Sequence, residues 1–326
     1  MKKDFLESRF MGRFRPLFVS WFITDKCNMR CLKCGRGRGG LGHAQAPVID
    51  RVIEEAAANK VWRINLTGGE PLLHPALGDI IERLNHAGVR VSVSSNGLLV
   101  PEKLDALAGA AGISLSLDGG SETHDAARGP GSFKSVLAAL AALREYGIPA
   151  KITSVISRHT GETDIEDVVK TAAEYGAPVS FQPLLSVQLG TSDPNPDAPD
   201  PLVFRALINH VIELKEKFPR AILNSVKGLR HLMRWPDDAP ITCGAGRFFC
   251  QIDPAGNLFA CGSSQGTEAP CGNILQTGLM APFEHKQKSC AECSQCWCGE
   301  RVEANLMFGL DPHALINYFR TRHGYD

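Results

Sequence analysis

The sequence predicts an α/β protein built on a parallel sheet and followed by a smaller cysteine-rich segment. Short apolar runs alternate with helical patterns between residues 16 and 220, glycine and polar residues directly follow several of these runs, and the composition changes from residue 236 onward. Strands that alternate with helices pair in parallel, and such a sheet either stays open or curls into a complete or partial barrel. In both cases ligands bind at the carboxyl ends of the strands.

The strands are predicted from apolar runs of strand length. Six such runs occur, at 18–24 (FVSWFIT), 63–68 (RINLTG), 90–95 (RVSVSS), 112–117 (GISLSL), 150–156 (AKITSVI) and 178–184 (PVSFQPL). The clearest helix between them covers 132–147, where Val136, Leu140 and Leu143 recur on one face before Gly147 ends it. Residues 163–176 repeat the pattern.

Residues suited to binding follow four of these strands in succession. The first strand leads into Cys27, Cys31 and Cys34, spaced C-x3-C-x2-C. The second leads into Gly68, Gly69, Glu70 and Pro71, the third into Ser95, Asn96 and Gly97, and the fourth carries Ser116, Asp118 and Gly119, with Arg128 shortly after. Because these strand ends share one edge of the sheet, the sequence predicts one site there.

Composition excludes several classes of protein. Lys and Arg total 35, as do Asp and Glu, which gives no electrostatic reason to expect nucleic acid or an anionic membrane as a partner. No apolar run is long enough to span a bilayer, and residues 1–16 contain no continuous hydrophobic segment of the signal-peptide kind. We therefore expect a cytoplasmic protein.

Eleven cysteines fall into two groups, three at 27–34 and eight at 243–298. Disulfide scaffolds are usually short, secreted chains with evenly distributed cysteines, so clustered thiols here favour metal or iron–sulfur ligands. Taken alone, C-x3-C-x2-C is also compatible with half of a zinc site.

Taken together, these motifs resemble the radical S-adenosylmethionine (SAM) enzymes. The triplet of cysteines, GGEP, SNG, SLDG and RGxGSF occur in the order of that family and on its strands. The resemblance implies a partial (β/α)6 barrel, similar to part of a TIM barrel, at 16–235 after a short segment 1–15. It also implies a [4Fe–4S] cluster held by Cys27, Cys31 and Cys34, with one iron left open for the amino and carboxylate groups of SAM.

The same resemblance implies the chemistry and the SAM contacts. A flavodoxin- or ferredoxin-type donor would supply an electron to the cluster. The reduced cluster would then split SAM into methionine and a 5′-deoxyadenosyl radical that removes a substrate hydrogen. Gly68 and Gly69 would let the backbone approach SAM, and Glu70 would accept a hydrogen bond from the SAM ammonium group. The other implied contacts are Ser95 and Asn96 near the ribose and sulfonium, Ser116 and Arg128 at the carboxylate, and residues 181–184 along the adenine.

Several of these features have other interpretations. Lys33 stands where the family usually has an aromatic residue, so adenine stacking is lost or becomes cation–π in character. GGEP alone could be a tight turn with Pro71 at a helix start, and His124 with Asp125 fits the start of a helix. Arg36 and Arg38 either bind an anionic substrate group or belong to a solvated loop.

The second group of cysteines begins beyond Pro236. Residues 248–253 and 257–261 predict a β-hairpin around Pro254–Gly256, and Cys243 and Cys261 flank it. This segment, 236–305, resembles the auxiliary-cluster extension of radical SAM enzymes, called SPASM in its long form and twitch in its short form; a helix or tail follows at 306–326. The resemblance implies at least one auxiliary [4Fe–4S] cluster held by Cys243, Cys261, Cys290 and Cys293, with Cys296 as an alternative ligand.

Other assignments of this segment stay open. Eight cysteines are enough for two clusters, and C-x2-C pairs also occur in zinc ribbons. Cys250 and Cys271 fit the small buried residues that free cysteines often are.

An auxiliary cluster favours a net oxidation, such as dehydrogenation, crosslinking or decarboxylation, because it can take the second electron. Alternatives are a redox-neutral radical SAM epimerase or isomerase and, from another class, a non-catalytic iron–sulfur or zinc protein. The substrate is a small molecule or a peptide, with only about fifteen residues before the first strand for a leader-binding domain. The Asp- and Pro-rich loop 186–201 is either a lid or plain surface.

Overall fold

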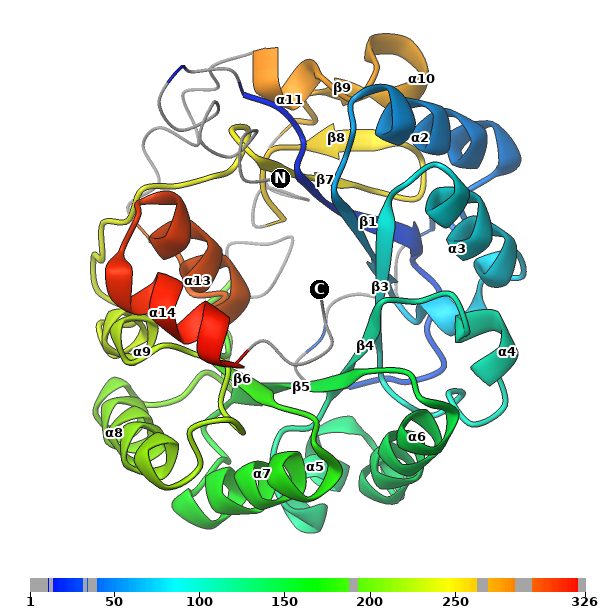
Figure 1. Ribbon diagram of the computed structural model, residues 1–326. Coiled ribbons are helices and arrows are strands. Elements are labelled where there is room, and N and C mark those ends of the chain that lie inside the picture. The colour runs from blue at the N-terminus through cyan, green and yellow to red at the C-terminus, as the bar shows by residue number, and fades with distance from the viewer. Residues whose placement is uncertain are drawn as a thin grey trace.

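The protein forms one continuous sheet that curves into an incomplete barrel (Figure 1). The computed structural model describes residues 11, 14–31, 34, 40–187, 193–262, 269–284 and 295–321. Within them the strand order is β6-β5-β4-β3-β2-β1-β7-β8-β9. The predicted α/β partial barrel is confirmed by six parallel strands: β1 (Phe18–Thr24), β2 (Arg63–Gly68), β3 (Arg90–Ser95), β4 (Gly112–Ser116), β5 (Ala150–Ile156) and β6 (Val179–Pro183).

Helices cover the convex side of these strands (Figure 1). Alternate strand residues such as Ile64 and Leu66 are fully buried beneath them, which explains the apolar runs in the sequence. The predicted helix at 132–147 ends at Gly147, whose φ of 77° is left-handed. The covering elements are α2 (Ala46–Ala58), η1 (Pro71–Leu73), α3 (Leu77–His86), α4 (Leu104–Leu107), α5 (Ser121–Arg128), α6 (Ser132–Tyr146), α7 (Glu162–Tyr175) and α8 (Pro201–Lys217).

The concave face of the sheet carries polar side chains. Asn65 of β2 donates to Ser94 Oγ at 3.1 Å and accepts from Ser92 Oγ at 3.1 Å, and Ser114 Oγ lies 2.9 Å from Thr153 Oγ1. The barrel interior is therefore hydrogen-bonded across neighbouring strands and differs from the aliphatic layer beneath the helices.

The predicted hairpin is confirmed, and it extends the barrel sheet. β7 (Phe249–Ile252) pairs in parallel with β1, and β8 (Asn257–Phe259) returns antiparallel to it before β9 (Gly272–Asn273). Asp253 Oδ1 accepts from the backbone N–H groups of Ala255 and Asn257, which fixes the turn. Because Phe249 lies opposite Phe18, the residues that precede β7 and follow β8 lie at the amino end of β1.

The remaining helices form two groups (Figure 1). α9 (Val226–Leu232), α13 (Gly299–Phe308) and α14 (Pro312–Thr321) pack together beside β6, on the open side of the barrel, whereas α10 (Ile274–Thr277) and α11 (Ala281–Glu284) lie beside β9 and β8. α13 lies against β6 (Figure 1), where Gly299 N donates to Gln182 Oε1 at 3.1 Å. A Cβ at Gly299 would lie 2.6 Å from Phe181 O, so glycine permits this close contact.

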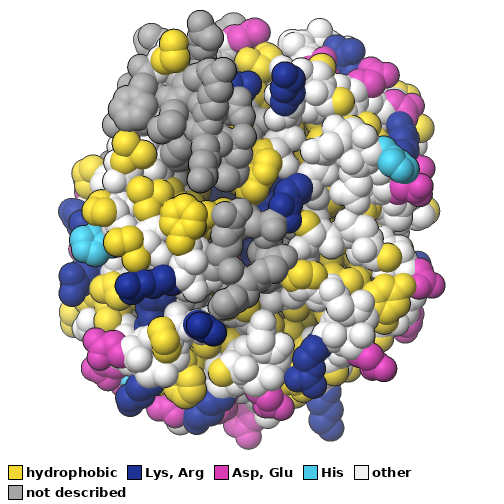
Figure 2. All heavy atoms as spheres, viewed as in Figure 1, with side chains coloured by type: hydrophobic (Ala, Val, Ile, Leu, Met, Phe, Trp, Pro, Cys, Tyr) yellow, Lys and Arg dark blue, Asp and Glu magenta, His cyan; other side chains and the backbone are white. Residues whose placement is uncertain are grey.

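Charged side chains of both signs are interspersed around the outer helices on the face shown in Figure 2, in keeping with a formal net charge of zero. Among the described residues, no helix has the length and apolar character needed to cross a membrane.

Candidate functional site

The first cysteine loop leaves the carboxyl end of β1 and returns to it. Asp25 closes its neck: Asp25 Oδ2 accepts from Leu41 N at 2.6 Å, Asp25 Oδ1 accepts from Gly42 N at 2.8 Å, and Asp25 N donates to Gly42 O at 3.0 Å. Cys27, Cys31 and Cys34 are partly buried within this loop. Burial raises the pKa of the Cys27 and Cys31 thiols, so they hold their protons until a metal displaces them.

Gly68 and Gly69 dock the end of β2 onto this loop. Gly69 N donates to Thr24 O at 2.9 Å, and Glu70 N donates to Lys26 O at 2.8 Å. A Cβ at Gly68 would lie 2.0 Å from Thr24 O, and one at Gly69 would lie 2.2 Å from Lys26 O. The glycines are thus required by the approach of the cysteine loop itself, a role that the sequence does not reveal. Pro71 starts η1, as the turn interpretation of GGEP expects.

Glu70 is fully buried and ties three segments together. Its carboxylate accepts from Leu72 N at 3.1 Å, Ser95 Oγ at 3.0 Å and Asn96 N at 2.8 Å. Burial raises the pKa of Glu70 to about 7, although the three hydrogen bonds lower it. Glu70 therefore positions the Ser95–Asn96 turn beside the cysteine loop.

Asn96 completes the connection between the third strand and the cysteines. Its Nδ2 donates to Asn28 Oδ1 at 2.8 Å, and its Oδ1 accepts from Leu98 N at 3.0 Å. Asn28 lies next to Cys27, at one of the unspecified positions of the C-x3-C spacing. The structure thus brings the ends of β1, β2 and β3 together, as predicted.

The fourth strand supplies a buried ion pair. Arg128 Nε donates to Asp118 Oδ2 at 2.5 Å, and Asp118 Oδ1 accepts from Val155 N at 2.9 Å. Cys31 and Cys34 lie near enough to Arg128 to raise the pKa of its guanidinium, although less than Asp118 does and against the lowering by burial. Ser116 ends β4 opposite Thr153 of β5.

His124 and Asp125 have structural roles. They lie within α5 and not at its start; Asp125 instead accepts from Gly131 N, Ser132 Oγ and Phe133 N, which holds the start of α6. His124 is fully buried, and its Nδ1 accepts from Asp118 N at 3.1 Å.

The donor set fits an iron–sulfur cluster. Three soft thiols suit iron or zinc better than a hard cation. In the part of the chain that the structure describes, no three His, Cys, Asp or Glu side chains gather as they would around a single metal ion. A cluster spreads its cysteines further apart, because each binds a different iron.

A second group of thiols lies at the opposite end of the barrel strands. Cys243 and Cys261 pack against a small separate core that includes Leu17, Phe248 and Phe308. Cys296 and Cys298 approach from the start of α13, and Arg301 Nη1 donates to Cys261 Sγ at 3.0 Å. The Arg301 pKa is raised by the charges of four nearby cysteines, which are Cys261, Cys298, Cys296 and Cys243. Their all-thiol character also fits an iron–sulfur cluster.

The sequence left Cys298 open as a ligand and gave no sign of Arg301. Cys298 lies with Cys243, Cys261 and Cys296 near Arg301, which carries no motif at all. The predicted ligands Cys290 and Cys293 lie outside the described residues. Cys250 is 2% exposed within β7, in keeping with a small buried residue, and Cys271 packs partly buried against the same small core.

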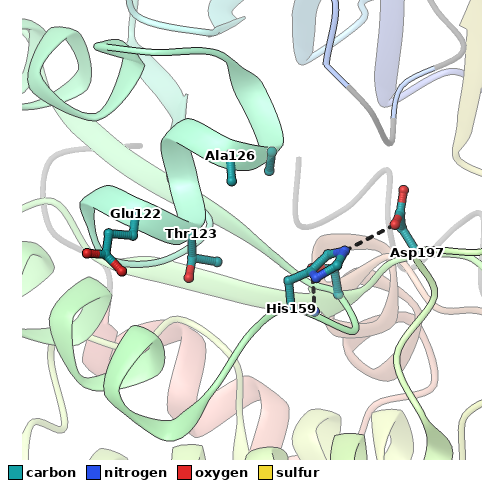
Figure 3. Close-up of a pocket in the computed structure, with 7 residues that line it drawn as sticks. Glu122, Thr123, Ala126, His159 and Asp197 are labelled. Carbon is teal, nitrogen blue, oxygen red and sulfur yellow. Dashed lines mark hydrogen bonds and ion pairs between the residues drawn. The ribbon is translucent and has the colours of Figure 1, made fainter.

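A cavity of about 330 Å³ opens at the carboxyl-end rim (Figure 3). It lies among residues that follow β4, β5 and β6: Glu122, Thr123, Ala126, Ala127, Ser157, His159 and Asp197. His159 Nε2 lies 3.2 Å from Asp197 Oδ1, and Arg158 N donates to Asp197 O at 3.0 Å. The described part of the predicted loop 186–201 is thereby tied to the end of β5.

Comparison with known proteins adds independent findings. The Radical SAM superfamily model matches residues 21–174. The chain is 30% identical to mycofactocin maturase MftC of Mycobacterium ulcerans over 82% of this chain and 74% of that protein. It is 29% identical to AdoMet-dependent heme synthase of Methanosarcina barkeri over 76% of this chain and 77% of that protein. The crystal structure of Streptococcus suis SuiB bound to precursor peptide SuiA shares the fold, with a TM-score of 0.67 at 16% identity, over 95% of this chain and 77% of that chain.

Proposed function

The chain belongs to the radical SAM superfamily and is a radical SAM enzyme of the kind that carries auxiliary clusters, and from this premise we propose that it completes a net oxidation of its substrate through a second iron–sulfur cluster. The observation that carries the proposal is the gathering of Cys243, Cys261, Cys296 and Cys298 around Arg301, at the end of β1 opposite the first cysteine loop. Family members use a [4Fe–4S] cluster to convert SAM into methionine and a 5′-deoxyadenosyl radical.

This chain's residues prepare the first site for that chemistry. We propose that Cys27, Cys31 and Cys34 hold the first cluster, in a loop fixed by Asp25, Gly68 and Gly69. Arg128 offers its guanidinium, held by Asp118, to the SAM carboxylate. Gly68, Gly69, Glu70, Ser95, Asn96 and Ser116 complete the SAM contacts; because Glu70 is already tied to Ser95 and Asn96, its main contribution is to orient that turn.

For the second cluster we propose Cys243, Cys261, Cys296 and Cys298 as the first candidates, with Cys290 and Cys293 as alternatives. Removing one hydrogen atom leaves a substrate radical, and an oxidation must remove one further electron. The two cysteine groups lie at opposite ends of the same strands, which supports hydrogen removal at the first group and removal of the second electron at the second group. The substrate would lie in the polar interior between them.

The names of similar proteins support a role in maturation. The chain resembles a maturase and a heme synthase, and it shares the fold of a protein crystallised with a precursor peptide. We propose that the substrate is a peptide or a biosynthetic precursor that presents hydrogen-bonding groups to Asn65, Ser94 and Thr153. We propose that the substrate reaches the barrel mouth past the cavity near His159.

The first test is iron and sulfide content with EPR on anaerobically reconstituted wild type and on the Cys27→Ala/Cys31→Ala/Cys34→Ala triple variant. About eight irons that fall to about four support one cluster in each cysteine group. Zinc in the variant contradicts an electron-accepting role for the second group. Counting SAM consumed per product then separates an oxidation, which spends one SAM per turnover, from a redox-neutral isomerisation that can recycle it.

A further inference from the structure

Arg301 is a partly buried cation within the second cysteine group. Its Nη1 donates to Cys261 Sγ at 3.0 Å, and its guanidinium carbon lies 5.5 Å from the centre of the Phe249 ring. A Cβ at Gly262 would lie 2.9 Å from Arg301 Nη2, so glycine allows the backbone to reach the guanidinium. Arg301 is thus held between a sulfur, a ring face and a bare backbone.

The charge of Arg301 is directed at sulfur. Among the thiols, Cys261 raises the pKa of the Arg301 guanidinium most, followed by Cys298, Cys296 and Cys243. The neighbouring acid, Glu300, is ion-paired with Lys151 of β5. Both Lys151 and Arg63 lower the pKa of the Glu300 carboxyl more than Arg301 does. In the first cysteine group, by contrast, the nearby Arg128 is paired with a carboxylate, Asp118.

A second donor lies on the same face of α13. Asn305 is one turn beyond Arg301, and positions four apart share a helix face. Asn305 Nδ2 lies 3.7 Å from Cys296 Sγ, and Asn305 Oδ1 accepts from Gly244 N at 2.9 Å, beside Cys243. One helical face therefore directs N–H donors at two of the four thiols and fixes the backbone beside a third.

We propose that Arg301 is a positioning residue that raises the reduction potential of the iron–sulfur group held by these cysteines. The inference rests on the proposed function, because it takes Cys261 as a ligand of that group. One-electron reduction adds a negative charge to the group, and a partly buried guanidinium with an N–H···S bond stabilises that added charge. A higher potential favours transfer of the second electron from a substrate radical.

The experiment isolates the second group in the full-length protein. The parent is the C27A/C31A/C34A triple variant, reconstituted anaerobically with iron and sulfide. Its midpoint potential is measured by EPR-monitored titration with dithionite and mediators, without SAM or substrate. Arg301→Gln removes the charge, Arg301→Lys keeps the charge but loses the planar fork, and Arg320→Gln replaces an exposed arginine of α14 as the matched control.

We expect Arg301→Gln to shift the reduction equilibrium toward the oxidised form at least tenfold, which is about 59 mV for a one-electron couple. Arg301→Lys should recover part of that shift, and Arg320→Gln should match the parent. The proposal is overturned if a fully iron-loaded Arg301→Gln variant has a reduction equilibrium constant within twofold of that of the parent. If Arg301→Gln does not retain iron, Arg301→Lys decides: a lowered potential with full iron content supports the proposal, and loss of iron or an unchanged potential overturns it. A parent that binds zinc or no iron contradicts the proposed function instead.

Discussion

The two cysteine groups of this protein are assembled in different ways. Cys27, Cys31 and Cys34 belong to one loop, and the neighbouring strand ends hold that loop through backbone contacts to residues 24–26. Cys243, Cys261 and the pair Cys296–Cys298 come from three separate segments, gathered by α13 and Arg301. The first group is thus a local motif supported by its surroundings, whereas the second exists only when the tertiary structure has formed.

The largest expected effect separates the two groups by reaction step. The triple replacement of Cys27, Cys31 and Cys34 by Ala should abolish 5′-deoxyadenosine formation, because no cluster then binds SAM. Cys243→Ala combined with Cys261→Ala should leave SAM cleavage in place and abolish the oxidised product. Both products are quantified by liquid chromatography after anaerobic reaction with dithionite. SAM cleavage by the triple variant would refute the assignment of the first group.

A second prediction concerns Arg128, the cation beside the first cysteine group. Arg128→Gln leaves the fully buried Asp118 without its counter-charge, which should lower the free energy of unfolding by about 3–5 kcal/mol and weaken SAM binding. Asp118→Asn should also destabilise the fold, because its single amide oxygen cannot accept from both Val155 N and Arg128 Nε, so one of these N–H donors then faces an NH2 group.

Urea unfolding and anaerobic SAM titration measure these two effects, and the double variant tests their coupling. Additive losses in the double variant would mean that the pair does not act as a unit.

The same contrast explains what the sequence reveals. The barrel strands and the first cysteine loop could be predicted because their signals are contiguous: an apolar run, then ligand-type residues at its carboxyl end. Arg301 could not, and Cys298 stayed one of several candidate ligands, because the significance of both depends on α13 folding back across the open side of the barrel. Gly68 and Gly69 were found by motif, but their contact partners are backbone carbonyls of the cysteine loop, and a backbone contact leaves no side-chain signature.

A third prediction tests that backbone contact. In Gly69→Ala the new methyl group would meet Lys26 O at 2.2 Å, so the cysteine loop must move, at a cost of about 2–3 kcal/mol in stability. Iron content should fall in the first group and stay unchanged in the second. Gly161→Ala is the matched control, because its φ of −107° suits alanine and the nearest atom would lie 3.8 Å away.

Iron analysis and EPR on both variants distinguish the outcomes. Equal loss of iron from both groups in Gly69→Ala would mean that the two groups are not independent.

The smallest expected effect is a pH dependence that belongs to the first group. The Glu70 pKa is raised by burial from 4.5 to about 7, so folding favours the protonated carboxyl. Its contribution to stability is complete below pH 4.5 and is lost as the pH rises through about 7. Glu70→Gln should flatten the pH dependence of stability by up to one proton. It should also lower stability by about 1–2 kcal/mol near pH 5, because one of the three N–H or O–H donors then faces an amide NH2.

Urea unfolding between pH 4.5 and 8 measures the slope, with the exposed Glu102→Gln as control. A slope that Glu70→Gln leaves unchanged would show that the hydrogen bonds from Leu72, Ser95 and Asn96 outweigh burial and keep Glu70 ionised, and Glu70 would then approach SAM as an anion.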